Sequence, residues 1–159
     1  MDRLWAPWRA ALLLKPPKGC IFCAIPRASS DRANYLLWRG PKTLVLLNLY
    51  PYSNGHLLIA PYRHVARIKD LRAAEASELF GEARRATTIL DRLLKPEGYN
   101  LGMNIGRAGG AAFAGHAHLH VVPRWIGDTN FMPVVHETKV VGRSLDALYD
   151  ELKKAYSKR

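Results

Sequence analysis

Three histidines alternate with apolar residues in the C-terminal half of the chain, at His116, His118 and His120. In an extended strand, side chains two residues apart project from the same face, so the three imidazoles form one row. At about 3.3 Å per residue, neighbours in this row are roughly 6.6 Å apart along the strand. A row with this spacing can follow a chain of phosphate groups. A neutral imidazole is also a good nucleophile near pH 7.

Two other interpretations of the histidine row remain open. The first is a solvated strand face, although neighbouring imidazoles repel each other when charged and then need a compensating ligand. The second is a catalytic metal site built from histidines alone. Three histidines on one strand are arranged too linearly to converge easily on one ion, and no Asp or Glu lies in the strand to orient them.

A pair of cysteines, Cys20 and Cys23, has the spacing of two ligands to one ion, and the chain has no others. Zinc bound there needs two more ligands, and two Cys with two His form a common structural set. A redox pair or two buried thiols are the alternatives, but a redox pair usually begins a helix in a βαβ setting that the sequence does not indicate. Two cysteines make no disulfide framework, which favours a reducing compartment.

The apolar patterns around these residues predict the elements that position them. Strands are expected at 35–39, 43–47, 56–60, 99–104 and 116–123, with Gly40-Pro41 turning the first two into a hairpin. A long helix is expected from a cap at Asp70 to about Leu94, and a second from 145 to 156 after a cap at Ser144. Because most strands follow one another through short turns, the pattern favours an α+β fold with an antiparallel sheet of about five strands.

The length of 159 residues fits a single domain, with an irregular arm at 1–19 and a helix with a basic tail at 144–159. A hydrophobic fraction of 48% and a charged fraction of 23% exclude a wholly disordered chain. The net charge of +11 favours an anionic partner, which could be a nucleotide, a nucleic acid or an acidic surface. No apolar run approaches the ~18 residues that cross a bilayer, and no signal peptide is evident, so we expect a cytoplasmic protein without membrane contact.

The histidine row belongs to a longer pattern that resembles the histidine triad (HIT) family of nucleotide hydrolases and transferases. The triad of that family reads His-φ-His-φ-His-φ-φ, where φ is apolar, as in residues 116–122 here. Segments upstream match in the same order: Asn48, Gly55–Pro61, Pro61-x-x-His64 and Asn104-Ile105-Gly106. The cysteine pair, Trp5–Arg9 and residues 123–131 are similar to the branch of bacterial diadenosine tetraphosphate phosphorylase-like and hydrolase-like proteins, which is also fragile-histidine-triad-like.

The resemblance implies an enzyme that cleaves dinucleoside polyphosphates, with His118 as the nucleophile on the α-phosphorus. It implies that His120 and His56 contact phosphate oxygens. The further nucleotide contacts expected from it are Asn48 at the ribose hydroxyls, Asn104 at the phosphates or leaving group, and Gly110, Ala111, Ala112 and Trp125. It also implies a structural zinc held by Cys20, Cys23, His64 and His116, and a homodimer that joins two sheets into one. Taken alone, Asn48 and Asn104 are equally consistent with ordinary turn residues, and His56 with a partly buried strand histidine. His136 is expected at the surface.

One departure from the family pattern concerns the loop before the triad. Ala112 stands four residues before His116, where most hydrolases of the family have Gln and phosphorylase-like members have Ser, and Ala111 stands where the latter tend to have Gly. Alanine has no side-chain donor, and such a donor can supply a few kcal/mol of transition-state stabilisation. The final acceptor, water or phosphate, therefore stays open.

Other functions also remain open on the sequence alone. A nucleoside phosphoramidase, a deadenylase of adenylated nucleic acid and a non-catalytic nucleotide-binding protein are the alternatives. The basic residues of the long helix, Arg84, Arg85, Arg92 and Lys95, favour a solvated face over a surface for a phosphate backbone.

Overall fold

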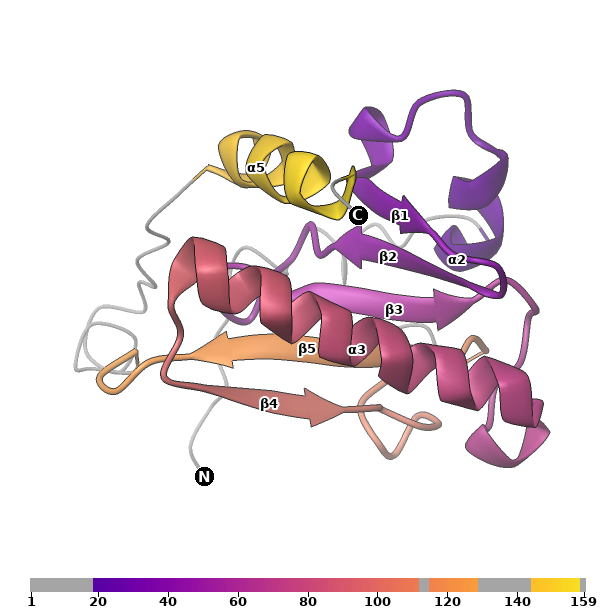
Figure 1. Ribbon diagram of the computed structural model, residues 1–159. Coiled ribbons are helices and arrows are strands. Elements are labelled where there is room, and N and C mark those ends of the chain that lie inside the picture. Colours follow the sequence, from indigo (N-terminus) through magenta and orange to yellow (C-terminus); the bar gives the residue numbers. More distant parts are fainter. Residues whose placement is uncertain (1–18, 112–114, 129–143, 158–159) are drawn as a thin grey trace.

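The computed structural model describes residues 19–111, 115–128 and 144–157 (Figure 1). Within them the elements are α2 (Ile21–Ala24), the 3-10 turns η2 (Ile25–Arg27), η3 (Arg32–Asn34) and η4 (Ile68–Asp70), the strands β1 (Leu36–Arg39), β2 (Thr43–Leu47), β3 (Leu57–Pro61), β4 (Gly98–Gly102) and β5 (Leu119–Arg124), and the helices α3 (Ala73–Leu94) and α5 (Leu145–Ser157). The arm up to residue 18, Ala112, His136 and the last two residues of the basic tail lie outside the described residues.

The strands form one five-stranded antiparallel sheet in the order β1-β2-β3-β5-β4. The expected hairpin of β1 and β2 is present, and β3 continues it by pairing with β2. Helix α3 carries the chain back across the sheet, after which β5 inserts between β3 and β4 (Figure 1). The structure confirms the predicted α+β class with one long helix and one C-terminal helix.

The two faces of the sheet are covered by different helices. One face packs against α3 and α5 in a core that includes Val45, Ile59, Leu90 and Leu152. The opposite face forms a second apolar cluster with Phe22 of α2. Because side chains alternate along a strand, Leu58 and its cross-strand partner His120 project to this second face. The triad therefore lies on the side of the sheet away from α3.

Helix α3 begins two residues later than predicted, at Ala73 instead of directly after Asp70. Asp70 ends η4, and Arg72 is the residue before the helix. The buried carboxylate of Glu75 accepts the backbone N–H of Arg72 at 2.8 Å and two hydrogen bonds from Arg63 at 3.0 and 2.7 Å. A Glu at this third helical position that accepts the N-terminal N–H is half of a capping box, and here it fixes the start of the helix. The predicted end near Leu94 is confirmed, since Lys95 adopts a left-handed conformation with φ 48°.

Strand β5 also differs from the prediction, since it starts at Leu119 and not at His116. The backbone N–H of Ala117 donates to the Val65 carbonyl, 2.6 Å away, in the segment that follows β3. The first two triad histidines therefore lie just before the regular ladder with β3. Ring centroids of His118 and His120 are 4.8 Å apart, closer than the spacing of an ideal strand.

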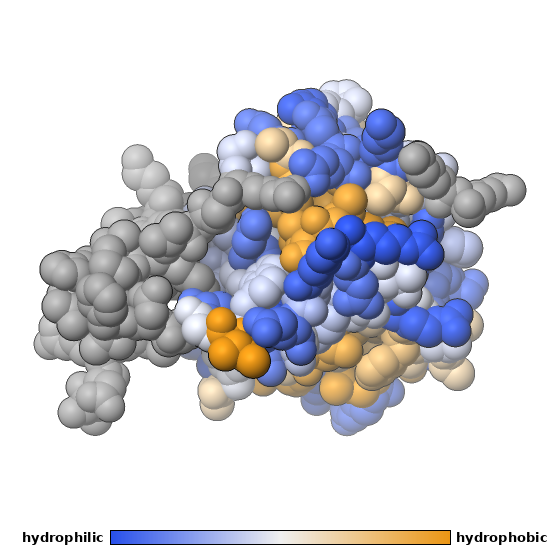
Figure 2. Space-filling view, turned by 60° about the vertical axis from the view of Figure 1, so that its left-hand side comes forward, coloured by the Kyte–Doolittle hydropathy of each residue, from blue (hydrophilic) through white to orange (hydrophobic). Residues whose placement is uncertain are grey.

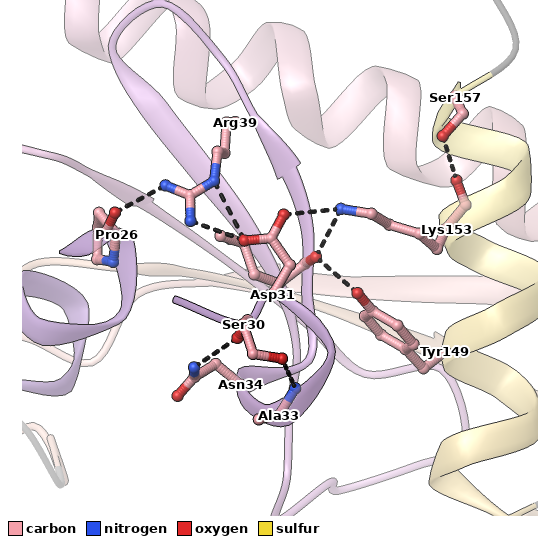
Figure 3. Close-up of polar contacts among 10 residues, drawn as sticks. Pro26, Ser30, Asp31, Ala33, Asn34, Arg39, Tyr149, Lys153 and Ser157 are labelled. Atoms are coloured by element: carbon pink, nitrogen blue, oxygen red, sulfur yellow. Dashed lines mark hydrogen bonds and ion pairs between the residues drawn. The ribbon is translucent and has the colours of Figure 1, made fainter. Parts of the chain in front are cut away.

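Helix α5 is fastened to the edge strand β1 by polar contacts. The ammonium of Lys153 donates to the Leu36 carbonyl at 3.0 Å and to Asp31 at 3.1 Å, and Tyr149 Oη donates to the same carbonyl at 3.2 Å (Figure 3). Burial raises the pKa of Asp31, but hydrogen bonds from Arg39 and Lys153 outweigh it and leave the pKa below its ordinary value. These contacts lie at the outer edge of β1. An uncovered edge strand can pair with a strand of another chain.

Basic residues of the described surface are partly used in internal contacts. The Arg85 guanidinium lies 4.3 Å from the ring of Trp38 and donates to the Tyr156 carbonyl at 2.6 Å. Hydrophilic side chains cover much of the described surface in the view of Figure 2, with an apolar patch among them.

Among the described helices, none has both the length and the apolar composition needed to cross a membrane.

Candidate active site

His118 is held in one orientation by the backbone before it. Its Nδ1 lies 2.8 Å from the His116 carbonyl oxygen, and a carbonyl only accepts, so Nδ1 carries the proton. The lone pair of the neutral ring is therefore on Nε2. The His118 side chain is 4% exposed, and this burial lowers its pKa below the ordinary value. The ring is thus kept neutral, which is the form that can act as a nucleophile.

A chain of two hydrogen bonds fixes the protons of His56 and His120 in the same way. The Tyr52 backbone N–H donates to His56 Nδ1 at 3.0 Å, so this nitrogen bears the lone pair and Nε2 bears the proton. His56 Nε2 then donates to His120 Nδ1, 2.9 Å away. A neutral His120 consequently carries its own proton on Nε2. The two neighbouring imidazoles of the triad differ in character, with His118 offering a lone pair and His120 offering a donor.

His56 and Asn48 were both expected to contact the nucleotide, and the structure brings them together beside His120. His56 is fully buried, and both of its ring nitrogens have protein partners. Asn48 accepts the Tyr50 N–H at 2.9 Å and its amide nitrogen lies 3.1 Å from His56 Nδ1. His56 is therefore placed to orient the ring of His120.

Asn104 and the glycine-rich loop follow β4, whose last residue, Gly102, pairs with His120 in the sheet. The ladder with β5 ends at this pair, so the contact of Asn104 with the phosphates or leaving group stays a prediction. The loop then turns through Gly106 and Gly110, with φ of +70° and +76°. The N–H groups of Gly110 and Ala111 donate within the loop, to Arg107 and Gly106. Phosphate contacts of Gly110 and Ala111 stay predictions, as does that of Ala112, which lies outside the described residues.

Trp125 is placed apart from these residues. It lies five residues beyond His120, about 16 Å further along an extended strand. Its indole N–H donates to the Lys95 carbonyl at 3.2 Å, at the C-terminal end of α3. The structure therefore does not bring Trp125 to His118, and its nucleotide contact also stays a prediction.

The four expected metal ligands converge at one end of this face. Ligand atoms of Cys20, Cys23, His64 and His116 all lie within 4.8 Å of one another. His116 Nδ1 is 3.2 Å from Cys20 Sγ, and His64 Nδ1 is 3.3 Å from Cys23 Sγ. Tetrahedral zinc, with bonds of about 2.3 Å to sulfur and 2.0 Å to nitrogen, sets such N···S separations at roughly 3.5 Å. The donor set and its spacing therefore fit zinc.

The protonation of His116 agrees with this fit. Its Nε2 lies 2.9 Å from the Pro61 carbonyl, so Nε2 carries the proton and the Nδ1 lone pair faces the two sulfurs. A metal-binding histidine usually donates its other N–H in this manner. Burial also lowers the pKa of His116, which favours the neutral ring that a metal needs.

Two aromatic residues of the site were missed by the sequence analysis. Tyr52 stacks on His56 at 4.9 Å between ring centroids and lies 5.9 Å from His120. Phe22 lies 4.7 Å from His118 and 5.1 Å from His116. Phe22 stands between the two cysteines of the predicted metal site, so its position could have been suspected from the sequence. Tyr52 had no such signal, because it stands in a turn cluster of ordinary composition.

Comparison with known proteins agrees with the fold. The model of the HIT domain matches residues 32–125. The AP-4-A phosphorylase of Mycobacterium tuberculosis is 36% identical over 155 residues, covering 91% of this chain and 79% of that protein. The asymmetrical bis(5'-nucleosyl)-tetraphosphatase of Schizosaccharomyces pombe is 30% identical over 108 residues, covering 68% and 56% of the two chains.

Among solved structures, a zinc-bound histidine triad protein of Mycobacterium smegmatis superimposes with a TM-score of 0.71 at 23% identity, covering 88% of this chain and 94% of that chain. This likeness supports the fold. An antiparallel sheet that carries a row of histidines on one face is typical of histidine triad proteins. The chain belongs to the HIT family and is an enzyme of that family.

Proposed function

We propose that this protein cleaves dinucleoside polyphosphates, such as diadenosine tetraphosphate, at the α-phosphorus through a nucleotidyl group held covalently on His118. The observation that carries the proposal is the fixed tautomer of His118, whose Nε2 lone pair stands beside the donor-bearing ring of His120. The substrate class is supported by the similarity to an AP-4-A phosphorylase over 91% of the chain.

In the first step, His118 Nε2 attacks the α-phosphorus. A P–N bond forms while the bond from the α-phosphorus to the bridging oxygen breaks, and the rest of the polyphosphate leaves as a nucleotide. The Nε2–H of His120 donates to a phosphate or leaving-group oxygen, where negative charge develops. Asn104 is proposed beside the same oxygens.

In the second step, an acceptor oxygen attacks the phosphorus and the P–N bond breaks, which returns the lone pair to His118. Water as the acceptor gives a nucleoside monophosphate, and inorganic phosphate gives a nucleoside diphosphate. Ala112, the position that leaves the acceptor open, lies outside the described residues, so both acceptors remain within the proposal.

His56 is proposed as a positioning residue for His120 and not as a phosphate contact. Its full burial and its two hydrogen-bonded nitrogens support this role. Asn48 supports the ring of His56 from the other side and keeps a second amide N–H, which we assign to the ribose hydroxyls.

A structural zinc is proposed at Cys20, Cys23, His64 and His116. When bound, such an ion supplies folding energy and no reaction chemistry. Cys20 directly precedes α2 and Cys23 lies in it, His64 follows β3, and His116 stands two residues before His118. The ligands therefore join the parts of the chain that frame the triad.

A homodimer is proposed through the edge strand β4. Of the two edge strands, β1 is blocked by Lys153 and Tyr149, whereas Asn100, Leu101 and Gly102 of β4 are exposed among the described residues. Pairing two copies of β4 would extend the sheet across both subunits. A cytoplasmic location stays our expectation, as does the absence of a nucleic-acid partner.

Product analysis tests the proposed reaction. The protein is incubated with diadenosine tetraphosphate, with and without inorganic phosphate, and the nucleotides are separated. AMP plus ATP in both cases indicates a hydrolase, and ADP plus ATP only with phosphate indicates a phosphorylase. If neither pair forms, the proposal is wrong, and phosphoramidates, adenylated nucleic acid and binding without turnover are then tested.

A further inference from the structure

Phe22 connects the metal cluster to the catalytic histidine. It lies in α2, between Cys20 and Cys23, and its side chain is fully buried. Its ring centroid is 4.7 Å from that of His118 with the planes inclined by 32°, and 5.1 Å from that of His116. One aromatic ring therefore touches both a metal ligand and the nucleophile.

The orientation of His118 needs a second restraint besides its hydrogen bond. The bond from Nδ1 to the His116 carbonyl fixes one atom of the ring, but the ring can still tilt about that contact. A flat side chain packed on the imidazole face removes this freedom, because any tilt loses van der Waals contact on one side. Phe22 occupies that position.

The position of Phe22 in turn depends on the residues beside it. Helix α2 has only four residues, too few to be stable alone. Its backbone is closed by the N–H groups of Cys23 and Ala24, both donating to the Cys20 carbonyl. Binding both thiolates to one ion would fix this single turn, and with it the Phe22 side chain.

We infer that Phe22 is a positioning residue that transmits the order of the metal cluster to the His118 ring, so that metal occupancy sets how well the nucleophile is aligned. The inference rests on two parts of the proposed function, His118 as the nucleophile and zinc at Cys20, Cys23, His64 and His116. It concerns how this chain uses its metal cluster.

Nuclear magnetic resonance of the histidine rings tests the structural part without any turnover. Ring signals of His118 are recorded in zinc-loaded protein and after chelation, in the wild type and in Phe22→Leu. Leucine keeps an apolar side chain but has no ring current. Removing zinc is expected to shift the His118 ring protons in the wild type and to shift them much less in Phe22→Leu. The part of the shift that passes through His116 and the backbone stays in both proteins, so their difference isolates Phe22.

Steady-state kinetics test the catalytic part. Phe22→Leu, with its zinc content measured, is expected to lower kcat roughly 10- to 100-fold and to change KM less than about 3-fold, since a small misplacement of a reacting group carries a cost of this size. Leu46→Val is the matched control, because Leu46 is buried in the same apolar cluster on this face, and it is expected to keep kcat.

Three results would overturn the inference. These are His118 signals that do not respond to zinc, an equal response in Phe22→Leu, or a rise in KM with kcat unchanged, which would make Phe22 a substrate contact. A wild-type protein without turnover contradicts the proposed function alone, because the resonance experiment still decides whether zinc order reaches His118.

Discussion

At the scale of single residues, backbone groups decide which nitrogen of each histidine is the nucleophile or the donor. The His116 carbonyl can only accept, and the Tyr52 N–H can only donate. These two contacts set opposite tautomers on His118 and His120, although both side chains belong to one row. The division of roles between two chemically identical groups therefore follows from the path of the backbone.

The link from His56 to His120 gives the first prediction. His56→Asn removes the ring that donates to His120 Nδ1, so His120 loses its fixed tautomer. We expect kcat to fall about 10²-fold with a small change in KM, the size of effect usual for a proton donor. Tyr52→Phe is the control, since it keeps both the stacked ring and the backbone N–H, and it is expected to retain near-normal kcat. Equal losses in the two variants would argue against the tautomer account.

Several residues that the sequence singled out lie together in the structure, but their individual contacts could not be predicted from the sequence. The period-two pattern placed the triad on one face, and the cysteine pair with His64 and His116 does converge. The complete burial of His56 could not be read from the sequence, because it depends on the turn that stacks Tyr52 on the His56 ring. The contact of Phe22 with His118 also arises only from tertiary packing.

At the scale of elements, α3 begins at an ion pair between buried Glu75 and half-exposed Arg63, and the effect of this pair on stability depends on pH. Hydrogen bonds from Arg63, assisted by the Arg72 N–H, lower the pKa of Glu75 from 4.5 to about 2. A carboxyl with a lowered folded-state pKa stabilises the fold fully above its unfolded pKa and loses that contribution as pH falls through the folded value. The stabilisation is therefore expected above about pH 5 and should disappear toward pH 2.

Denaturant unfolding of wild type and Glu75→Gln measures this effect. At pH 6 the variant is expected to be less stable by about 2 kcal/mol, the usual size for a hydrogen bond to a charged group. Between pH 4.5 and pH 2 the two free energies of unfolding should converge. A difference that stays constant over this range would mean that the charge of Glu75 contributes nothing. Zinc loss at low pH affects both proteins and cancels in the comparison.

The element boundaries show where local sequence signals compete. Asp70 is a good helix cap by residue type. The helix nevertheless begins after Arg72, because the Glu75 carboxylate accepts the Arg72 N–H and closes the first turn. Strand β5 starts late because the Ala117 N–H bonds to Val65 instead of joining the ladder. Both outcomes depend on partners more than two residues away, which periodicity does not report. The end of α3 was predictable, since Pro96 and Gly98 terminate it locally.

The tie between α2 and the sheet yields a prediction on metal removal. Chelation of zinc-loaded protein is expected to lower the free energy of unfolding by about 2 kcal/mol or more, because ligand binding to the native state adds directly to stability. Cys23→Ser is expected to show the lower stability at once and little response to the chelator. If chelation leaves the free energy of unfolding of the wild type unchanged, a structural metal is excluded.

At the scale of the whole molecule, the two edges of the sheet differ in availability. Helix α5 covers β1 through Lys153, Tyr149 and Asp31, whereas Leu101 of β4 is 49% exposed. We expect sedimentation to give a dimer for the wild type and a monomer for Leu101→Lys, since a charge on an edge strand opposes pairing. Ile68→Lys, at a residue that is 57% exposed in η4, is the matched control and should stay dimeric. A dimer that survives in Leu101→Lys would move the interface elsewhere.

The central claim is that His118 carries the nucleotidyl group during turnover, and trapping that group tests it most directly. Protein mixed with excess diadenosine tetraphosphate is quenched within milliseconds in alkali, where a phosphoramidate survives, and its peptides are analysed by mass spectrometry. We expect one adenylyl group on the peptide that contains His118, and none in His118→Ala, whose kcat/KM should fall at least about 10³-fold. An adenylyl group on another residue, or undiminished turnover by His118→Ala, would contradict it.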